Sequence, residues 1–140
     1  MKIAYTGGSF DVALHEGHIN FLKNCKKIAD KVVVSLNTDS FIERFKRKPV
    51  LSYKERKAML LGCKYVDEVI ENFGEEDSKP AILLVKPDFI CIGSDWAKKD
   101  YMAQMKFNQE WLDENNITLV YFQYTDGISS SDIINRIKNL

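Results

Sequence analysis

Short apolar runs alternate along the chain with longer stretches in which apolar residues recur at helical spacing. Residues 32–34 are three consecutive valines inside a short apolar run, whereas residues 17–29 repeat apolar side chains every three or four positions. Continuous apolar strands are typical of parallel sheets buried on both faces, and their alternation with helices is the pattern of successive strand–helix units. We therefore expect an α/β fold: one domain over residues 1–140, with a five-stranded parallel sheet and helices on both faces.

The same pattern gives approximate bounds for each element. The expected strands are Lys2–Tyr5, Lys31–Leu36, Glu68–Ile70, Phe89–Ile92 and Thr118–Phe122, with a turn at Thr6–Ser9 after the first. The expected helices are Gly17–Ala29, one that begins after Ser52, then Lys79–Val85, Tyr101–Asn115 and Ser130–Lys138. Ser52 resembles a helix N-cap because Glu55 follows at the spacing of a capping box.

Three polar segments that contain glycine follow expected strands: Thr6–His18, Gly93–Trp96 and Tyr124–Ser131. In open α/β sheets ligands bind beyond the carboxyl ends of the strands, where the strand order reverses. We therefore expect these segments to build one site.

Composition limits the kinds of partner. With 140 residues, 45% of them hydrophobic, the chain suffices for one core, and 20 basic residues balance 20 acidic ones. No overall field attracts nucleic acid or anionic membrane, so we expect neither partner. Cys25, Cys63 and Cys91 are widely spaced in apolar surroundings, which indicates reduced, packed thiols. No signal-peptide pattern or apolar run of about 20 residues occurs, so we expect a soluble, cytoplasmic protein.

The glycine-containing segment after the first strand carries the chain's two histidines. Gly7–Asp11 gives a backbone that can approach a ligand closely and leads to a helix N-terminus, which favours anions, although such glycines are often plain turn residues. His15 and His18, three residues apart, could both donate to a phosphoryl oxygen. A zinc site lacks further ligands at suitable spacing, and a capping or buried histidine remains an alternative.

Four motifs in order resemble one known family. They are Gly8-Ser9-Phe10-Asp11 with His15-x-Gly-His18, Ser52-Tyr-Lys-Glu-Arg56 with Tyr65–Ile70, Gly93-Ser-Asp-Trp96, and Gly127-Ile-Ser-Ser130. Together they resemble the cytidylyltransferases of the His-x-Gly-His nucleotidylyltransferase superfamily, most closely the glycerol-3-phosphate cytidylyltransferase type. The likeness covers nearly the whole chain and implies a Rossmann-like domain, a homodimer and a nucleotidyl-transfer reaction.

The resemblance also implies roles for individual residues. His15 and His18 would contact the triphosphate and stabilise the transition state, with Lys46 and Arg47 as further catalytic residues from a basic loop that closes over the substrates. The implied nucleotide-binding residues are Gly7, Gly8, Ser9, Phe10, Asp11, Asp95, Trp96, Thr125, Gly127, Ile128, Ser129 and Ser130. Without the resemblance, Ser129–Ser131 is a plain N-cap and the basic run Arg44–Lys48 is solvated surface or a weak nucleic-acid patch.

The acceptor side departs from the family pattern. The implied acceptor-binding residues are Asp39, Arg56, Lys64 and Tyr124. Lys64 and Tyr124 stand where the closest relatives carry arginine, and residues 97–115 are longer than in the glycerol-phosphate enzymes. These departures weaken glycerol 3-phosphate as acceptor more than they weaken the type of reaction.

The reaction we expect transfers CMP from CTP to the phosphate of a small polar metabolite, such as glycerol 3-phosphate or phosphoglutamine. Mg²⁺ would be the cofactor, carried by CTP and held near Asp11, with no metal site built by the protein. Other branches of the superfamily use ATP, so an adenylyltransferase is an alternative. A regulatory nucleotide-binding protein without turnover is another.

Overall fold

The computed structural model describes residues 1–94 and 100–140, and within them the five expected strands form one sheet. The strands are β1 (Ile3–Gly8), β2 (Lys31–Leu36), β3 (Glu68–Glu71), β4 (Phe89–Gly93) and β5 (Thr118–Phe122). All neighbours are parallel, in the order β3-β2-β1-β4-β5. The expected five-stranded parallel sheet is confirmed. Its order reverses between β1 and β4, which is the Rossmann-like arrangement.

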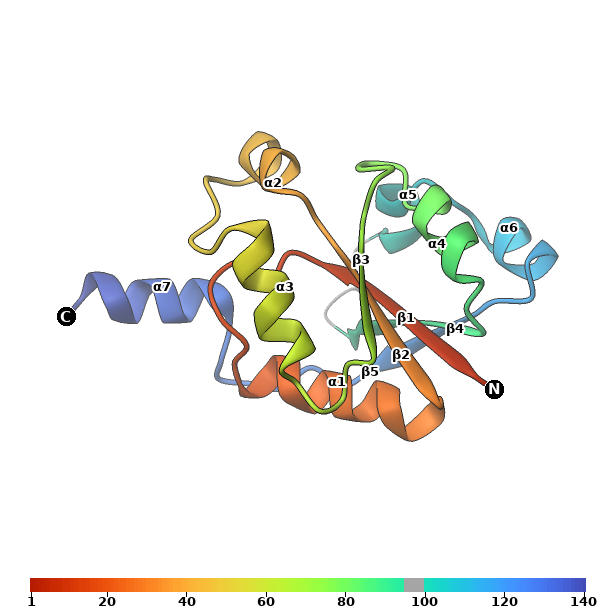
Figure 1. The fold of residues 1–140 in the computed structure, drawn as a ribbon, viewed down its shortest axis with the longest axis horizontal. Coiled ribbons are helices and arrows are strands. Elements are labelled where there is room, and N and C mark those ends of the chain that lie inside the picture. Colours follow the sequence, from red (N-terminus) through yellow and green to blue (C-terminus); the bar gives the residue numbers. More distant parts are fainter. Residues whose placement is uncertain (95–99) are drawn as a thin grey trace.

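Helices cover both faces of this sheet, as expected (Figure 1). One face packs against α1 (Glu16–Ile28) and α3 (Tyr53–Leu61), which bury Leu22 and Leu60 in the first core cluster. The other face packs against α4 (Lys79–Val85), α5 (Tyr101–Met105) and α6 (Gln109–Glu114), which form the second cluster. Two further helices, α2 (Asp39–Phe45) and α7 (Ser130–Lys138), follow β2 and β5.

Three details differ from the sequence prediction. The turn expected at Thr6–Ser9 is wrong, because β1 runs on to Gly8 in register with Leu36 of β2. The single helix expected over Tyr101–Asn115 is wrong: Lys106 adopts a left-handed conformation with φ 66° and ends α5, and Asn108 then caps α6. Helix α2 was not predicted, although its Thr38 N-cap is a recognisable start signal.

The cysteines pack as expected. Cys25 and Cys91 are fully buried in the first core cluster, and Cys63 packs against it. Within residues 1–94 and 100–140, no helix combines the length and apolar character needed to cross a membrane.

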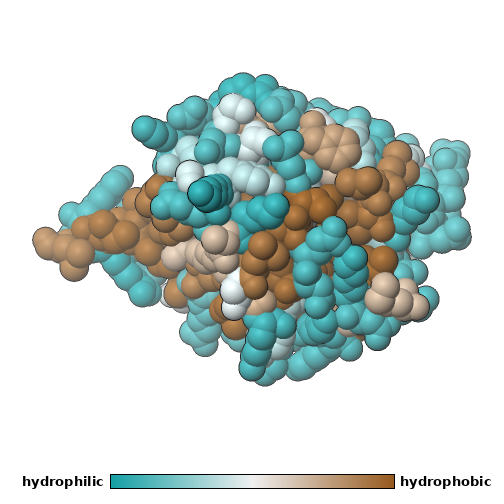
Figure 2. Space-filling view, viewed as in Figure 1, coloured by the Kyte–Doolittle hydropathy of each residue, from teal (hydrophilic) through white to brown (hydrophobic). Residues whose placement is uncertain are grey.

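Helix α7 projects from the body of the molecule (Figure 1), and Figure 2 shows apolar residues along it. None of its residues is buried, and Ile137 near its C-terminus is 57% exposed. The helix therefore adds little to the core. Its N-terminus is the part that reaches the cavity described next, through Ser130.

Candidate active site

A cavity of about 740 Å³ lies at the carboxyl ends of the strands, where the strand order reverses. All three segments singled out in the sequence contribute to its wall, through residues such as Gly8, Gly93 and Thr125. The three segments therefore meet at one cavity, as expected from their positions after the strands. Of the predicted site residues, those that line the cavity are Gly7, Gly8, Ser9, Phe10, Asp11, His18, Lys46, Tyr124, Thr125 and Ser130.

The two histidines form a reciprocal cap at the start of α1. His15 Nδ1 accepts hydrogen bonds from the backbone N–H of Gly17 at 3.0 Å and of His18 at 3.4 Å. His18 Nδ1 in turn accepts from the His15 N–H at 3.3 Å. Since Nδ1 accepts in both neutral rings, the ring proton of each is assigned to Nε2. The capping interpretation is confirmed, and each histidine keeps one ring N–H.

The environment keeps both imidazoles neutral. The rings stack with centroids 3.7 Å apart. Burial and the neighbouring His15 lower the pKa of His18 to about 4, although the Ala13 carbonyl and the Asp11 carboxylate partly oppose this. Burial also lowers the pKa of His15, which is 7% exposed. At neutral pH both side chains are therefore uncharged hydrogen-bond donors.

The glycine between the histidines makes room for the His15 ring. A Cβ at position 17 would lie 2.8 Å from His15 Cε1 and 3.0 Å from its Nδ1. At Gly8 a Cβ would meet the Phe10 ring at 2.8 Å, and Phe10 has a left-handed φ of 47°. A bulky residue in that region is strained, which is typical of functional loops. Both glycines thus permit close packing around the helix N-terminus.

Asp11 ties the basic segment after α2 to this loop. Its side chain is nearly buried and accepts from Arg47 Nη2 at 2.6 Å, and its carbonyl accepts from the Leu51 N–H. Lys46, at the end of α2, lines the cavity itself. Of the predicted catalytic pair, Lys46 therefore lines the cavity, and Arg47 contacts the loop through Asp11.

The loop before α7 closes the cavity from the other side. Thr125 accepts from Asn20 Nδ2 of α1 at 3.3 Å, and the Tyr124 hydroxyl donates to the Ile128 carbonyl at 3.0 Å. Gly127 has φ 84°, a conformation that favours glycine. Ser129 caps α7 by accepting from the Asp132 N–H. The N-termini of α1 and α7, two anion-favouring groups, therefore face one cavity.

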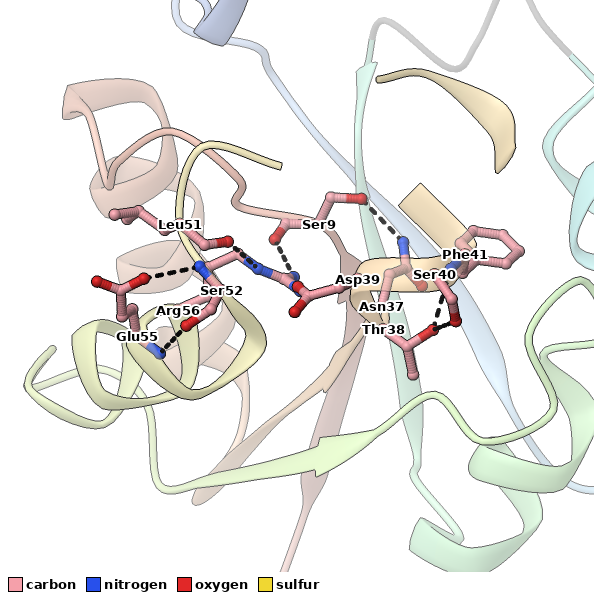
Figure 3. Close-up of polar contacts among 10 residues, drawn as sticks. All are labelled: Ser9, Asn37, Thr38, Asp39, Ser40, Phe41, Leu51, Ser52, Glu55 and Arg56. Carbon is pink, nitrogen blue, oxygen red and sulfur yellow. Dashed lines mark hydrogen bonds and ion pairs between the residues drawn. The ribbon is translucent and has the colours of Figure 1, made fainter. Parts of the chain in front are cut away.

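The buried Arg56 holds together three segments next to the cavity (Figure 3). Its guanidinium donates to the carbonyls of Ser9 at 2.8 Å and Leu51 at 3.1 Å, and to Asp39 at 2.7 Å. Its side chain has no exposed surface, and neither Arg56 nor Asp39 lines the cavity. This placement gives the pair a structural role in the protein as described and counts against direct contact with an acceptor.

One other predicted residue does not lie at the cavity. Lys64 lies just before β3, at the amino ends of the strands, with its Nζ over the Tyr65 ring. It thus lies at the opposite end of the strands from the cavity. Asp95 and Trp96 lie outside the described residues.

Sequence reasoning missed part of the cavity wall. Asn37 and Asn72 directly follow β2 and β3, and Arg44 of α2 pairs with both Glu75 and Glu76 at 2.7 Å. The two asparagines were predictable, because they are polar residues just after expected strands, like the three segments named above. The partners of Arg44 lie more than thirty positions away, and no local pattern marks them.

The described residues contain no group of three His, Cys, Asp or Glu side chains that could hold a metal ion. Asp11 is the carboxylate close enough to influence His18. Mg²⁺ commonly binds through one or two carboxylates together with substrate phosphates. A single aspartate in this position fits an ion that arrives with a nucleotide.

Comparisons with known proteins agree with this geometry. The bifunctional protein HldE of Helicobacter pylori strain J99 is 34% identical over 139 residues, which are 98% of this chain and 28% of that relative. HldE of Aeromonas salmonicida strain A449 is similar to the same degree. The chain thus spans just over a quarter of the length of these curated relatives.

Solved structures give the same fold. The lipopolysaccharide core biosynthesis protein from Thermoplasma volcanium superposes with a TM-score of 0.74 at 32% identity, covering 90% of this chain and 99% of that one. Pantothenate synthetase from Thermus thermophilus, at 15% identity and a TM-score of 0.66, covers 99% of this chain and 64% of that one, and shares the fold alone. Residues 5–136 match the family described as cytidylyltransferase-like. With the histidine pair, the glycine loop and the sheet topology in agreement, the chain belongs to the cytidylyltransferase-like family.

Proposed function

We propose that the protein transfers a nucleoside monophosphate from a nucleoside triphosphate to the phosphate of a small polar metabolite and releases pyrophosphate. The observation that carries this proposal is the neutral His15 and His18 pair, which caps α1 through both Nδ1 atoms and keeps one ring N–H on each Nε2, beside a glycine loop that lines the cavity. Donors fixed before the reaction stabilise charge that grows in the transition state.

The reaction is a single in-line displacement. An acceptor phosphate oxygen attacks the α-phosphorus and forms the new P–O bond, while the bond to the bridging oxygen breaks and pyrophosphate leaves. The chain's part is to position both substrates and to stabilise negative charge on the phosphoryl oxygens. His18 and the N-terminus of α7 supply donors to the cavity, and Lys46 supplies positive charge.

Mg²⁺ is the proposed cofactor. When bound with the triphosphate it offsets phosphate charge. Asp11 would hold it, and Arg47 now pairs with the same carboxylate at 2.6 Å. Arg47 would then exchange Asp11 for a phosphate, which guanidinium groups bind well.

Two parts of the cavity wall suit the two substrates. We call Gly7–His18 together with Tyr124–Ser130 the donor half, because it contains the glycine loop and both helix N-termini. We call Asn37–Lys46, Asn72–Glu76 and Gln104–Lys106 the acceptor half. Amides, carboxylates and lysines in the acceptor half suit a ligand with both hydroxyl and phosphate groups.

The relatives support the substrates that we propose. CTP is the proposed nucleotide because of the family match, and ATP is the alternative. A phosphorylated sugar or polyol is the proposed acceptor because the similar solved structure is a lipopolysaccharide core biosynthesis protein. Glycerol 3-phosphate and a phosphorylated amino acid such as phosphoglutamine belong in the same panel.

A pyrophosphate-release screen tests the proposal. The four nucleoside triphosphates are each mixed with phosphorylated sugars, polyols and amino acids in the presence of Mg²⁺. We expect release that depends on both substrates, together with the nucleoside diphosphate conjugate of the acceptor as the product detected by mass spectrometry. Nucleotide binding without release in any pair would instead support a non-catalytic binding protein.

A further inference from the structure

Two asparagines link the acceptor half to the glycine loop. Asn37 directly follows β2, and its backbone N–H donates to the Gly8 carbonyl at 3.0 Å. Asn72 directly follows β3, and its backbone N–H donates to the Leu36 carbonyl at 2.9 Å. The sheet therefore fixes the backbone of both residues at the carboxyl ends of neighbouring strands. Both side chains line the cavity.

The side chains form a hydrogen-bond relay that ends at Ser9. Asn72 Nδ2 donates to the Glu75 carbonyl at 3.0 Å and to Asn37 Oδ1 at 2.9 Å. Asn37 Nδ2 donates to Ser9 Oγ at 3.0 Å. Figure 3 shows the last of these contacts and the Arg56 contact to the Ser9 carbonyl, so Ser9 is held through both its side chain and its backbone.

The direction of this relay is fixed by its far end. The oxygen and nitrogen of an amide have nearly the same shape, so only their partners decide the orientation. The Glu75 carbonyl can only accept, which places Nδ2 of Asn72 toward it. Asn37 must then present its oxygen to Asn72 and its nitrogen to Ser9. The Ser9 hydroxyl therefore accepts from Asn37, and its own proton remains to be donated.

The orientation of the Asn72 amide leaves one buried oxygen without a partner among the described residues, which is energetically unfavourable. Asn72 Oδ1 is buried and has no hydrogen-bond partner in the part of the chain that the structure describes. An unpaired buried acceptor is unfavourable. Keeping the amide in this orientation preserves the direction of the relay.

We propose that Asn37 and Asn72 are positioning residues, which hold the Ser9 hydroxyl as a hydrogen-bond donor to a phosphoryl oxygen in the cavity. The inference rests on the proposed function for the identity of that oxygen. It adds two residues from the acceptor half to the machinery of the donor half. Substrate binding in one half would thereby act on a donor in the other.

A double-mutant cycle tests the relay. Asn37→Leu and Asn72→Leu are made with Ser9 intact and in the Ser9→Ala background, and Ser9→Thr is the conservative variant that keeps a hydroxyl. Asn115→Leu is the matched control, since its amide donates to the Trp111 carbonyl at the end of α6 and does not line the cavity. The readouts are kcat/KM from pyrophosphate release, affinity for CTP and ATP by calorimetry, and melting temperature.

We expect Ser9→Ala to lower kcat/KM about tenfold or more, as for a lost hydrogen bond to a charged group. Asn37→Leu or Asn72→Leu should cost about three- to tenfold with Ser9 present and less than about twofold in the Ser9→Ala background. In the Ser9→Thr background, kcat/KM should again fall when either asparagine is replaced. Asn115→Leu should leave kcat/KM unchanged.

Equal losses in the two backgrounds would overturn the relay, because they would show that the asparagines act independently of Ser9. An active wild type with fully active asparagine variants would overturn it as well. If the wild type binds nucleotide without releasing pyrophosphate, the proposed function fails, and the relay is then judged from the same cycle in CTP and ATP affinity. A wild type that binds neither nucleotide overturns both.

Discussion

The histidine cap of the donor half and the polar side-chain contacts of the acceptor half differ in their range along the chain. In the donor half, His15 caps α1 through residues two and three positions away. In the acceptor half, Arg44 reaches Glu75 across 31 positions and Asn72 reaches Asn37 across 35. The cap needs only a few consecutive residues. The acceptor-half contacts form only when β2, β3 and α2 are assembled. The donor half should therefore be sensitive to local geometry and the acceptor half to global stability.

Arg56→Ala should give the largest effect, because it removes the buried link between the two halves. The variant leaves the Ser9 and Leu51 carbonyls without their donor and opens a cavity in place of a side chain with no exposed surface. Unpaired buried acceptors cost about 1–3 kcal/mol each, so we expect a loss of about 3–5 kcal/mol in the free energy of unfolding. Urea denaturation followed by circular dichroism measures it.

Arg136→Ala is the matched control for a lost arginine ion pair. Arg136 pairs with Asp132 on exposed α7, so its removal should cost about 0.5 kcal/mol or less. If Arg56→Ala were as stable as Arg136→Ala but had a raised KM for the acceptor, the acceptor-binding role predicted from the sequence would be favoured instead.

His18→Ala tests the donor half directly. It removes one fixed donor while most of the α1 cap, formed by His15, remains. We expect turnover to fall by about 10²–10³, equivalent to about 3–4 kcal/mol of transition-state stabilisation. Steady-state pyrophosphate release measures this loss. The His18→Gln variant, whose amide can restore an N–H donor, should recover part of the turnover. A fully active His18→Ala variant would rule out the proposed role.

The sequence predicted most of the donor half because its determinants are local. The spacing of His15, Gly17 and His18 and the cap at Ser129 are short patterns with a direct structural meaning. The structure brings the starts of the two helices to one cavity, through Gly17, His18 and Ser130. The parallel sheet also followed from the alternating elements, since parallel strands need crossover connections. What the sequence could not give was the reciprocal cap, in which each histidine serves the other's backbone.

The acceptor half was predicted poorly for the opposite reason. Arg56 looks like an exposed cation in a helix that begins at Ser52, and only the assembled fold shows that Ser9 and Asp39 surround it. The break at Lys106 was also missed, because a lysine carries no signal for a left-handed conformation. Side chains whose partners lie far along the chain are fixed by packing, which periodicity does not report.

Acid should destabilise the donor half through His18. The pKa of His18 is lowered to about 4 by burial and by His15, against about 6.5 in the unfolded chain. Between these values the unfolded chain binds more protons, so the stabilisation is fully present above pH 6.5 and is lost as the pH falls toward 4. We expect a loss of roughly 2 kcal/mol after allowance for partial exposure. Urea denaturation from pH 7.5 to 4.5 measures it, and His18→Gln should show a shallower slope.

Gly17→Ala should change the position of the His15 ring without changing the free energy of unfolding. The new Cβ would lie 2.8 Å from His15 Cε1, so the imidazole must move and its Nδ1 must lose the contacts to the Gly17 and His18 amides. Loss of a cap costs about 1 kcal/mol, but alanine is more favourable than glycine in a helix by about the same amount, so the free energy of unfolding should hardly change. Turnover should nevertheless fall about tenfold, because a displaced ring no longer presents its Nε2–H correctly.

The control for this change is Gly62→Ala at the end of α3, where the nearest atom to a new Cβ, the Met59 carbonyl oxygen, is 3.4 Å away. That variant should keep both stability and turnover. The two alanine variants are compared in urea denaturation and pyrophosphate release under the same conditions. If Gly17→Ala also kept full turnover, the position of the His15 ring would not matter for the reaction, and glycine at position 17 would be needed only for packing.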